Sequence, residues 1–181
     1  MNDIITKLSK QLDFEDVGLV CRTIGKTEDG KYKGLFLIHK TSRSVFTRFN
    51  EVCGLGWEDE YFYDAKDNLY CKIKVWDPEK ERWIGRVGVG TPSEIEKEKA
   101  TYSDALKRAS VEFGHGLELY HMPKIIIDLA ENQVELVKGK HYLHKYRVDL
   151  KRWTISYKWE NKKVSDLIIK NENGELKCKI L

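Results

Sequence analysis

The sequence lacks a long apolar run. No stretch approaches the roughly 18 consecutive apolar residues that a membrane-crossing helix needs, and the mean hydropathy is −0.55. The first sixteen residues carry charges every few positions, without the apolar segment or small-residue cleavage site of a signal peptide. For a chain of 181 residues, we therefore expect a soluble protein of one domain, with at most a small appendage, that has no membrane contact and works in a cytoplasm.

Patterns for disulfides, metals and nucleotides are missing as well. The four cysteines, at positions 21, 53, 71 and 178, include no CxxC pair, so we expect reduced, buried thiols. His141 and His144 have no thiolate or carboxylate pair at zinc-ligand spacing. No GxxxxGK[ST] loop occurs, and the glycines within residues 85–90 instead predict that a helix or another backbone approaches a strand closely. We expect neither a metal nor another cofactor, and no ATP-driven chemistry.

Charge is abundant but unevenly distributed. The formal net charge is only +3, yet residues 138–181 contain twelve Lys and Arg against five Asp and Glu, a net of +7 that leaves −4 for residues 1–137. This asymmetry indicates either that the C-terminal quarter faces an anionic partner or that it is a solvated basic surface.

Local patterns predict a helix and a hairpin in the first forty residues. Apolar residues recur at helical spacing over residues 2–12, which predicts an amphipathic helix. Residues 17–24 and 32–38 are short β-prone runs, and Asp29-Gly30 between them supplies the tight turn of a hairpin.

A helix and three strands are predicted next. Residues 41–53 have a helical apolar stripe, with Ser42 or Thr41 as N-cap and Gly54 as the C-terminal stop. Polar turns of hairpin length then separate three β-prone runs, which predicts an antiparallel meander. The three runs cover residues 57–64, 69–76 and 82–89.

A second, long helix has the clearest local signature. The segment Thr91–Glu94 combines an N-cap hydroxyl, a proline at the first helical position and a capping-box glutamate. The helix is predicted to run to Phe113 and to pack its apolar stripe on the sheet, with Lys97 and Arg108 nearly opposite that stripe and Lys107 at its flank.

The remainder of the chain is predicted to be rich in strands. Residues 124–129 read as a strand, residues 130–140 as a short helix or turn, and residues 145–180 as further strands. The expected fold class is therefore α+β: a β-hairpin plus a three-stranded antiparallel sheet packed on a long helix, with a small basic β-rich extension. We expect a core domain over residues 1–125 and the extension over residues 126–181.

Cationic residues interleaved with aromatic residues are the strongest functional signal. They occur at Arg43–Arg48, at Arg82–Trp83 and at Lys151–Trp153. Guanidinium and ammonium groups neutralise phosphates while ring faces stack on bases, which is how single-stranded nucleic acid is held. Arg82 and Arg86 share one face of their strand by period-two spacing. The alternative interpretation is that the rings belong to the core and the arginines are merely solvated.

Carboxylates beside lysines raise a different possibility, a metal-dependent nuclease. Asp64 with Lys66, and Asp77 with Glu79 and Lys80, have the residue types that such sites place around Mg²⁺. Both sets lie in predicted turns, where Asp, Asn and Pro are expected for conformational reasons alone. A nuclease is therefore the weaker hypothesis, and we expect no catalytic residues.

Residues 103–124, SDALKRASVEFGHGLELYHMPK, resemble the signature of the phage Sak-type single-strand annealing proteins. These are viral relatives of the recombination mediator Rad-fifty-two, and in their signature a D-x-L-K-R-A helix leads into F-G and then L-Y-x-x-P. The segment from Arg43 to Trp57 and the V-G-V-G strand ending at Gly90 are similar to further family segments. The resemblance covers about residues 15–125.

The resemblance implies an annealing core that assembles into rings or filaments, with single-stranded DNA in a basic circumferential groove. Lys107 and Arg108 match the groove lysine and arginine of the family helix, and Arg43 or Arg48 matches the arginine of the preceding helix. Val111 stands where eukaryotic members have a third basic residue.

Further cations complete the predicted DNA-binding set. Lys97 and Lys99 are expected to supply the positive charge that is missing at Val111. Arg82 and Arg86 are included because they share one face of their strand. An auxiliary contact to a second strand or to an acidic partner is predicted in the extension, from Lys151, Arg152, Lys158, Lys162 and Lys163.

Two function classes follow, besides the weaker nuclease hypothesis. The first is ATP-independent annealing in homologous recombination, in the bacterial host cytoplasm for a phage protein, with a single-strand-binding protein or an exonuclease as candidate partner. The second is a single-strand-binding replication accessory protein without annealing activity.

Overall fold

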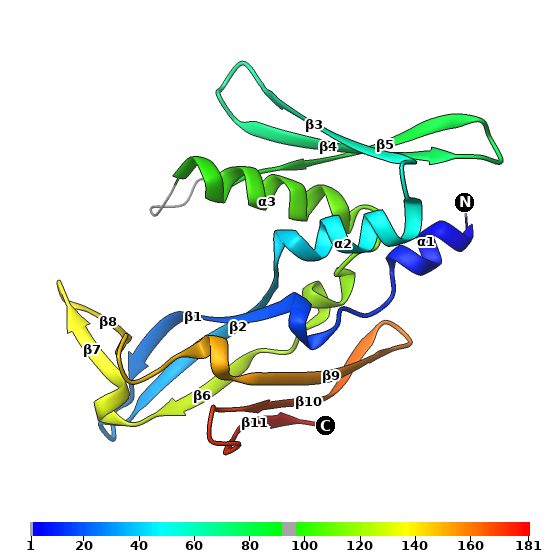
Figure 1. Ribbon diagram of the computed structural model, residues 1–181. Helices are drawn as coiled ribbons and strands as arrows, with labels where there is room; N and C mark the ends of the chain where they lie inside the picture. The colour runs from blue at the N-terminus through cyan, green and yellow to red at the C-terminus, as the bar shows by residue number, and fades with distance from the viewer. Residues whose placement is uncertain (1, 92–96) are drawn as a thin grey trace. The chain divides into compact units, whose positions relative to one another are not determined.

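The computed structural model describes residues 2–91 and 97–181 and has a mixed α+β fold with few helices and several small sheets (Figure 1). The chain divides into two compact units, each made of two chain segments. Unit 1 comprises Met1–Leu12 and Lys40–Leu117, and unit 2 comprises Asp13–His39 and Glu118–Leu181. No described helix is both long enough and apolar enough to cross a membrane.

Unit 1 contains three helices and one antiparallel sheet among its described residues. Its elements are α1 (Asn2–Leu8), α2 (Ser42–Cys53), β3 (Trp57–Tyr63), β4 (Leu69–Asp77), β5 (Arg82–Val89) and α3 (Lys97–Val111). The strands pair in the order β3-β4-β5, which confirms the predicted meander. Of the two predicted N-caps of α2, the structure has Thr41, whose hydroxyl accepts the Ser44 amide proton (3.2 Å). The helix stops as predicted at Gly54, whose amide donates to the Asn50 carbonyl (3.0 Å).

Helix α3 lies directly against β5, on one face of the sheet (Figure 1). A Cβ atom added at Gly88 would lie 2.2 Å from the Ala109 nitrogen, and one added at Gly90 would lie 2.4 Å from the Thr101 carbonyl oxygen. These glycines therefore allow the close approach of helix and strand that the sequence predicted. The core beneath the helix is made of Leu8, Val45, Phe49, Cys71, Ile73, Val75, Ala105, Leu106, Ala109 and Phe113.

Two of the three predicted helices, α1 and α3, end earlier in the structure than predicted. Helix α1 ends at Leu8 instead of continuing to Leu12, although Leu12 is still buried. Helix α3 ends at Val111 rather than Phe113, because the chain turns there and Gly114 adopts a positive φ of 89°. The predicted start of this helix, from Pro92 to Glu94, lies outside the described residues.

Unit 2 is built almost entirely of strands. Its strands are β1 (Val17–Lys26), β2 (Tyr32–Lys40, of which Lys40 belongs to unit 1), β6 (Ile125–Leu129), β7 (Val134–Val137), β8 (Lys140–Leu143), β9 (Thr154–Glu160), β10 (Lys163–Lys170) and β11 (Leu176–Ile180). Short 3-10 helices connect them: η1 (Phe14–Asp16), η2 (Leu117–His121, of which Leu117 belongs to unit 1), η3 (Glu131–Gln133) and η4 (Leu150–Arg152). Two three-stranded sheets have the orders β1-β2-β6 and β11-β10-β9, and β7 pairs with β8 alone.

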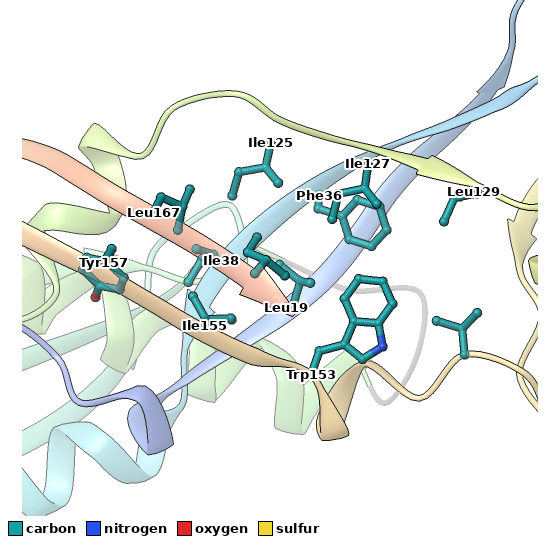
Figure 2. Close-up of a cluster of buried hydrophobic side chains, with 12 residues drawn as sticks. Leu19, Phe36, Ile38, Ile125, Ile127, Leu129, Trp153, Ile155, Tyr157 and Leu167 are labelled. Atoms are coloured by element: carbon teal, nitrogen blue, oxygen red, sulfur yellow. The ribbon is translucent and has the colours of Figure 1, made fainter. Parts of the chain in front are cut away.

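The core of unit 2 lies between its two three-stranded sheets (Figure 2). The rings of Phe36 and Trp153 stack with centroids 6.1 Å apart, and Ile125 and Ile127 of β6 are almost fully buried. The alternation of Trp153, Ile155 and Tyr157 toward one face is as predicted, since all three are buried.

Two expectations about the C-terminal part differ from the structure. Residues 130–140 form η3, strand β7 and a turn, because β7 finds an antiparallel partner in β8. The compact units also differ from the predicted core over 1–125 and extension over 126–181, because β2 pairs with β6 and packs with the C-terminal strands. A functional division at residue 125 stays a prediction.

The four cysteines are free thiols; Cys71 is buried, whereas the other three are half-buried.

Candidate nucleic-acid interface

Arg108, in the last turn of α3, is held by two neighbouring side chains. Its Nε donates to Asp104 Oδ2 (2.8 Å), and its Nη2 donates to Thr91 Oγ1 (3.2 Å). The same Asp104 oxygen accepts the Thr91 amide proton (3.0 Å). The Arg108 side chain is still 45% exposed. The acidic residue of the D-x-L-K-R segment therefore orients the arginine of the same segment, by an i,i+4 pair on one helix face.

The other cations of α3 occupy different positions on the helix. Lys107 is half-buried, and it lies about 100° around the helix axis from Arg108. Lys99 is exposed near the start of α3. Lys97 begins the helix, but its side chain lies outside the described residues. The structure thus places Lys107 and Arg108 on one rigid helix but on two flanks of it.

Arg82 and Arg86 share the face of the sheet on which α3 lies. The register pairs Arg86 with Ile73 and Arg82 with Asp77, and both partners point to the buried side. Because β5 is an edge strand of this sheet and both arginines are exposed, they line the margin of the helix-bearing face. The shared face was predicted correctly from the period-two spacing.

The two arginines of α2 have different surroundings. Arg43 is exposed. The Arg48 guanidinium instead donates to three main-chain carbonyl oxygens, those of Lys7 (3.4 Å), Lys10 (3.0 Å) and Gln11 (3.4 Å). The Lys7 carbonyl belongs to the last turn of α1, where a nearby cation stabilises the end of a helix. Arg48 therefore anchors the segment that follows α1, a role that the sequence did not reveal, and DNA contact by either arginine stays a prediction.

The predicted auxiliary cations all belong to unit 2. They are the exposed residues Lys151, Arg152, Lys158, Lys162 and Lys163. Lys158 forms an ion pair with Asp166 (2.7 Å), which raises the pKa of Lys158 and lowers the pKa of Asp166. Lys158 therefore shares its charge with a neighbouring carboxylate, as Arg108 does with Asp104.

The turn carboxylates that suggested a nuclease are engaged in their turns. Asp64 Oδ1 accepts the amide protons of Lys66 (2.8 Å) and Asn68 (2.9 Å), and the hydrogen bonds from Asn68 lower the pKa of Asp64. Asp77 Oδ1 accepts the Glu79 amide proton (3.1 Å). Within residues 2–91 and 97–181, no cluster of three or more His, Cys, Asp and Glu side chains could hold a metal ion.

Sequence reasoning missed a buried polar cluster in unit 1. Lys40 is only 5% exposed, and its Nζ donates to Ser110 Oγ (2.8 Å) and to the His115 carbonyl. Ser44 Oγ lies 3.3 Å from His115 Nε2. Burial, with Lys40 and Arg48 nearby, lowers the pKa of His115 to about 3. Since Ser44 and His115 are fully buried, no substrate reaches this pair, and its role is structural.

An aromatic surface on the other face of the unit 1 sheet was also missed. The rings of Phe62 and Tyr70 stack at 5.4 Å, and those of Trp76 and Trp83 meet edge-to-face at 5.6 Å. Between the two pairs, lysines of β4 form ion pairs with glutamates of β3. The alternation of apolar and polar residues along β4 could have revealed this surface, because it determines which residues of the strand share the outer face.

Comparison of the chain with protein-family models, with curated proteins and with solved structures finds no match in any of the three.

Proposed function

We propose that the protein binds single-stranded DNA and anneals complementary strands without ATP, as a relative of the phage Sak-type annealing proteins with a Rad-fifty-two-like core. Annealing brings two polyanions together, so a protein that neutralises phosphates lowers the repulsion between them. No covalent step is involved, and no cofactor is needed. The reaction belongs to homologous recombination, in a bacterial host cytoplasm for a phage protein.

The observation that carries this proposal is the fixed position of Arg108. An arginine oriented by Asp104 and Thr91 loses less side-chain entropy when it meets a phosphate than a mobile cation does. The glycine contact between β5 and α3 brings the strand that carries Arg82 and Arg86 against the same helix. Exposed cations on a rigid helix–strand pair favour binding along a phosphate backbone over recognition of bases.

Self-association into a ring or filament is part of the proposal. The aromatic surface formed by Phe62, Tyr70, Trp76 and Trp83 is partly exposed, and β3 and β5 are edge strands of their sheet. Exposed apolar area and unpaired strand edges favour contact with another chain. A single-strand-binding protein or an exonuclease is the candidate partner in the same pathway.

The test compares three variants in an annealing assay with complementary labelled oligonucleotides, in EDTA and without ATP. Changing Lys107 and Arg108 to Ala is expected to slow annealing and to reduce the salt slope of single-strand binding by about 1.4, because each contacted phosphate contributes about 0.7. Changing Lys66 and Lys80 to Ala removes the same charge from exposed turns of unit 1 and is the matched control.

The third variant, Asp104→Asn, tests whether the orientation of Arg108 matters for DNA binding in addition to its charge. The substituted side chain keeps an oxygen that can accept the Thr91 amide proton, while it loses the charge that pairs with Arg108. Because Arg108 keeps its charge but loses the carboxylate that orients it, we expect this variant to bind DNA more weakly than the wild type, with an unchanged salt slope. Annealing that is equally fast in the Lys107/Arg108 variant and in the control would refute the site, and tight binding without any annealing would instead favour the accessory-protein function.

A further inference from the structure

A second cationic surface lies on unit 2, at the hairpin β7–β8 and the turn that follows it. We define this basic hairpin surface by six exposed residues: Lys138, Lys140, Tyr142, Lys145, Tyr146 and Arg147. None of them was among the residues predicted to bind DNA. Figure 1 shows this hairpin extending from the end of the β1-β2-β6 sheet.

The hairpin is anchored at its base and exposed at its tip. The His141 ring meets the Tyr32 ring of β2 edge-to-face, with centroids 5.2 Å apart. Val134 and Leu143 pack against the unit 2 core. The tip is a two-residue turn in which Lys138 and Gly139 both have positive φ, of 48° and 77°. Such a turn normally has Asn, Asp or Gly at its first position, so a lysine is held at the tip at a cost in backbone strain.

The next turn presents its side chains in a similarly fixed way. The His144 amide donates to the Gln133 carbonyl (2.8 Å), and the amide of Val148, which is buried, donates to the His144 carbonyl (3.1 Å). With both ends held, the three residues between them project outward, and the Tyr146 side chain is 82% exposed. The Lys145 ammonium lies 4.7 Å from the centroid of that ring.

Within the described residues, no ion pair neutralises the cations of this surface, although Glu135 lies opposite Tyr142 in the hairpin. Residues 138–147 contain four Lys and Arg and no Asp or Glu. Among the described residues, no carboxylate lies within ion-pair distance of any of the four cations. This contrasts with Lys158 and Lys177 of the same unit, which pair with Asp166 and Glu175.

We propose that the basic hairpin surface is a second contact for single-stranded nucleic acid, in which its four cations meet phosphates and its two tyrosine rings stack on bases. This rests on the proposed function and adds a site to it on the other compact unit. Adjacent cations and exposed rings match the chemistry of an unpaired strand, whose bases offer ring faces that a duplex hides. A second site of this kind would hold one strand while the first site presents its complement.

The distribution of apolar residues favours nucleic acid over a lipid surface. Leu136 and Val137 are the exposed aliphatic residues of β7, and they point to opposite faces of the hairpin because they are consecutive in a strand. They therefore do not form the single apolar face that insertion into a bilayer requires. Tyr142 shares its face with its cross-strand partner Glu135 and with Val137 and Lys140, so this face is mixed and not apolar.

The test uses the full chain and a labelled thymidine oligonucleotide, with binding measured by fluorescence anisotropy at several salt concentrations. A variant with Lys138, Lys140, Lys145 and Arg147 changed to Gln is expected to lower the salt slope by up to about 2.8, at about 0.7 for each lost phosphate contact. The matched control changes Arg22, Lys124, Lys170 and Lys179 to Gln, which removes equal charge from exposed positions of the same unit that belong to no proposed contact.

A second variant tests stacking separately from charge. Changing Tyr142 and Tyr146 to Ser is expected to weaken binding about five-fold or more for each ring while leaving the salt slope unchanged. Both rings are exposed, Tyr142 by 49% and Tyr146 by 82%, so the variant is expected to melt at the wild-type temperature.

The possible outcomes separate the two proposals. A wild type that binds no oligonucleotide would overturn the proposed function and this inference with it. A hairpin variant that binds and anneals like the wild type, while the Lys107/Arg108 variant does not, would overturn this inference alone. Loss of binding to phosphatidylserine vesicles in the hairpin variant, with DNA binding intact, would show that a lipid surface is the occupant and would also overturn it.

Discussion

The contact between Gly88 and α3 makes a sharp prediction about stability. In a Gly88→Ala variant, the new Cβ atom would lie 2.2 Å from the Ala109 nitrogen and 2.7 Å from the Ala105 carbonyl oxygen. Both are backbone atoms, so no side-chain rotation relieves the overlap, and the helix must withdraw from β5 by about 1 Å. That movement would loosen Ala105, Leu106 and Ala109, which are essentially fully buried.

The expected loss is at least about 3 kcal/mol, at the upper end of what overpacking a core costs. For a chain of this length, that loss corresponds to a fall in melting temperature of roughly 6 to 12 °C, measured by circular dichroism. The matched control is Gly85→Ala on the same strand, where the added atom meets only flexible lysine side chains, with Lys72 Cε nearest at 3.0 Å. If the two variants melt within about 2 °C of each other, α3 does not rest on β5 as described.

Two further predictions concern a buried histidine and a strained turn. The folded-state pKa of His115, about 3, lies below the unfolded value near 6.5, so its contribution to stability is present above pH 6.5 and is lost as pH falls toward 3, by about 1.4 kcal/mol for each pH unit. Urea unfolding between pH 7.5 and 5 should show this slope in the wild type and a shallower one in His115→Gln; parallel slopes would contradict the burial. Lys162 in the β9–β10 turn has a φ of 60°, so Lys162→Gly should raise the free energy of unfolding by about 1 kcal/mol. Lys163→Gly, in strand β10, should lower it, and equal effects would contradict the turn geometry.

Features encoded by neighbouring residues could be predicted from the sequence. The Thr41 cap and the Gly54 stop of α2 depend on hydrogen bonds within four residues, and they appear where the local pattern put them. The three-stranded meander likewise joins runs that are adjacent in the chain. The close approach at Gly88 was predictable because a glycine weakens the interior of a strand and is typical of places where another backbone needs the space.

Features set by distant partners could not be predicted. Lys40 ends a strand and reads as a solvated cation, but the groups that bury it are 70 and 75 residues away. Arg48 looks like a groove cation until the carbonyls of residues 7, 10 and 11 are placed beside it. Strand β7 carries no clear period, and its pairing with β8 decides its structure. In the candidate site, the residue types and the shared faces could therefore be predicted from the sequence, whereas the contacts of Arg108 with Asp104 and Thr91 could not.

The interleaving of the two units in the sequence has a consequence for folding during synthesis. Residues 40–117 of unit 1 emerge from the ribosome as one continuous stretch, whereas hairpin β1–β2 of unit 2 must wait for residues 118–181. Synthesis of residues 40–117, at roughly 5 to 20 residues per second, takes about 4 to 16 s. Phe36 and Ile38, which are buried in the finished protein, remain uncovered during it. The nascent chain is therefore most open to chaperones, and most prone to wrong strand pairing, from the completion of β2 until β6 arrives.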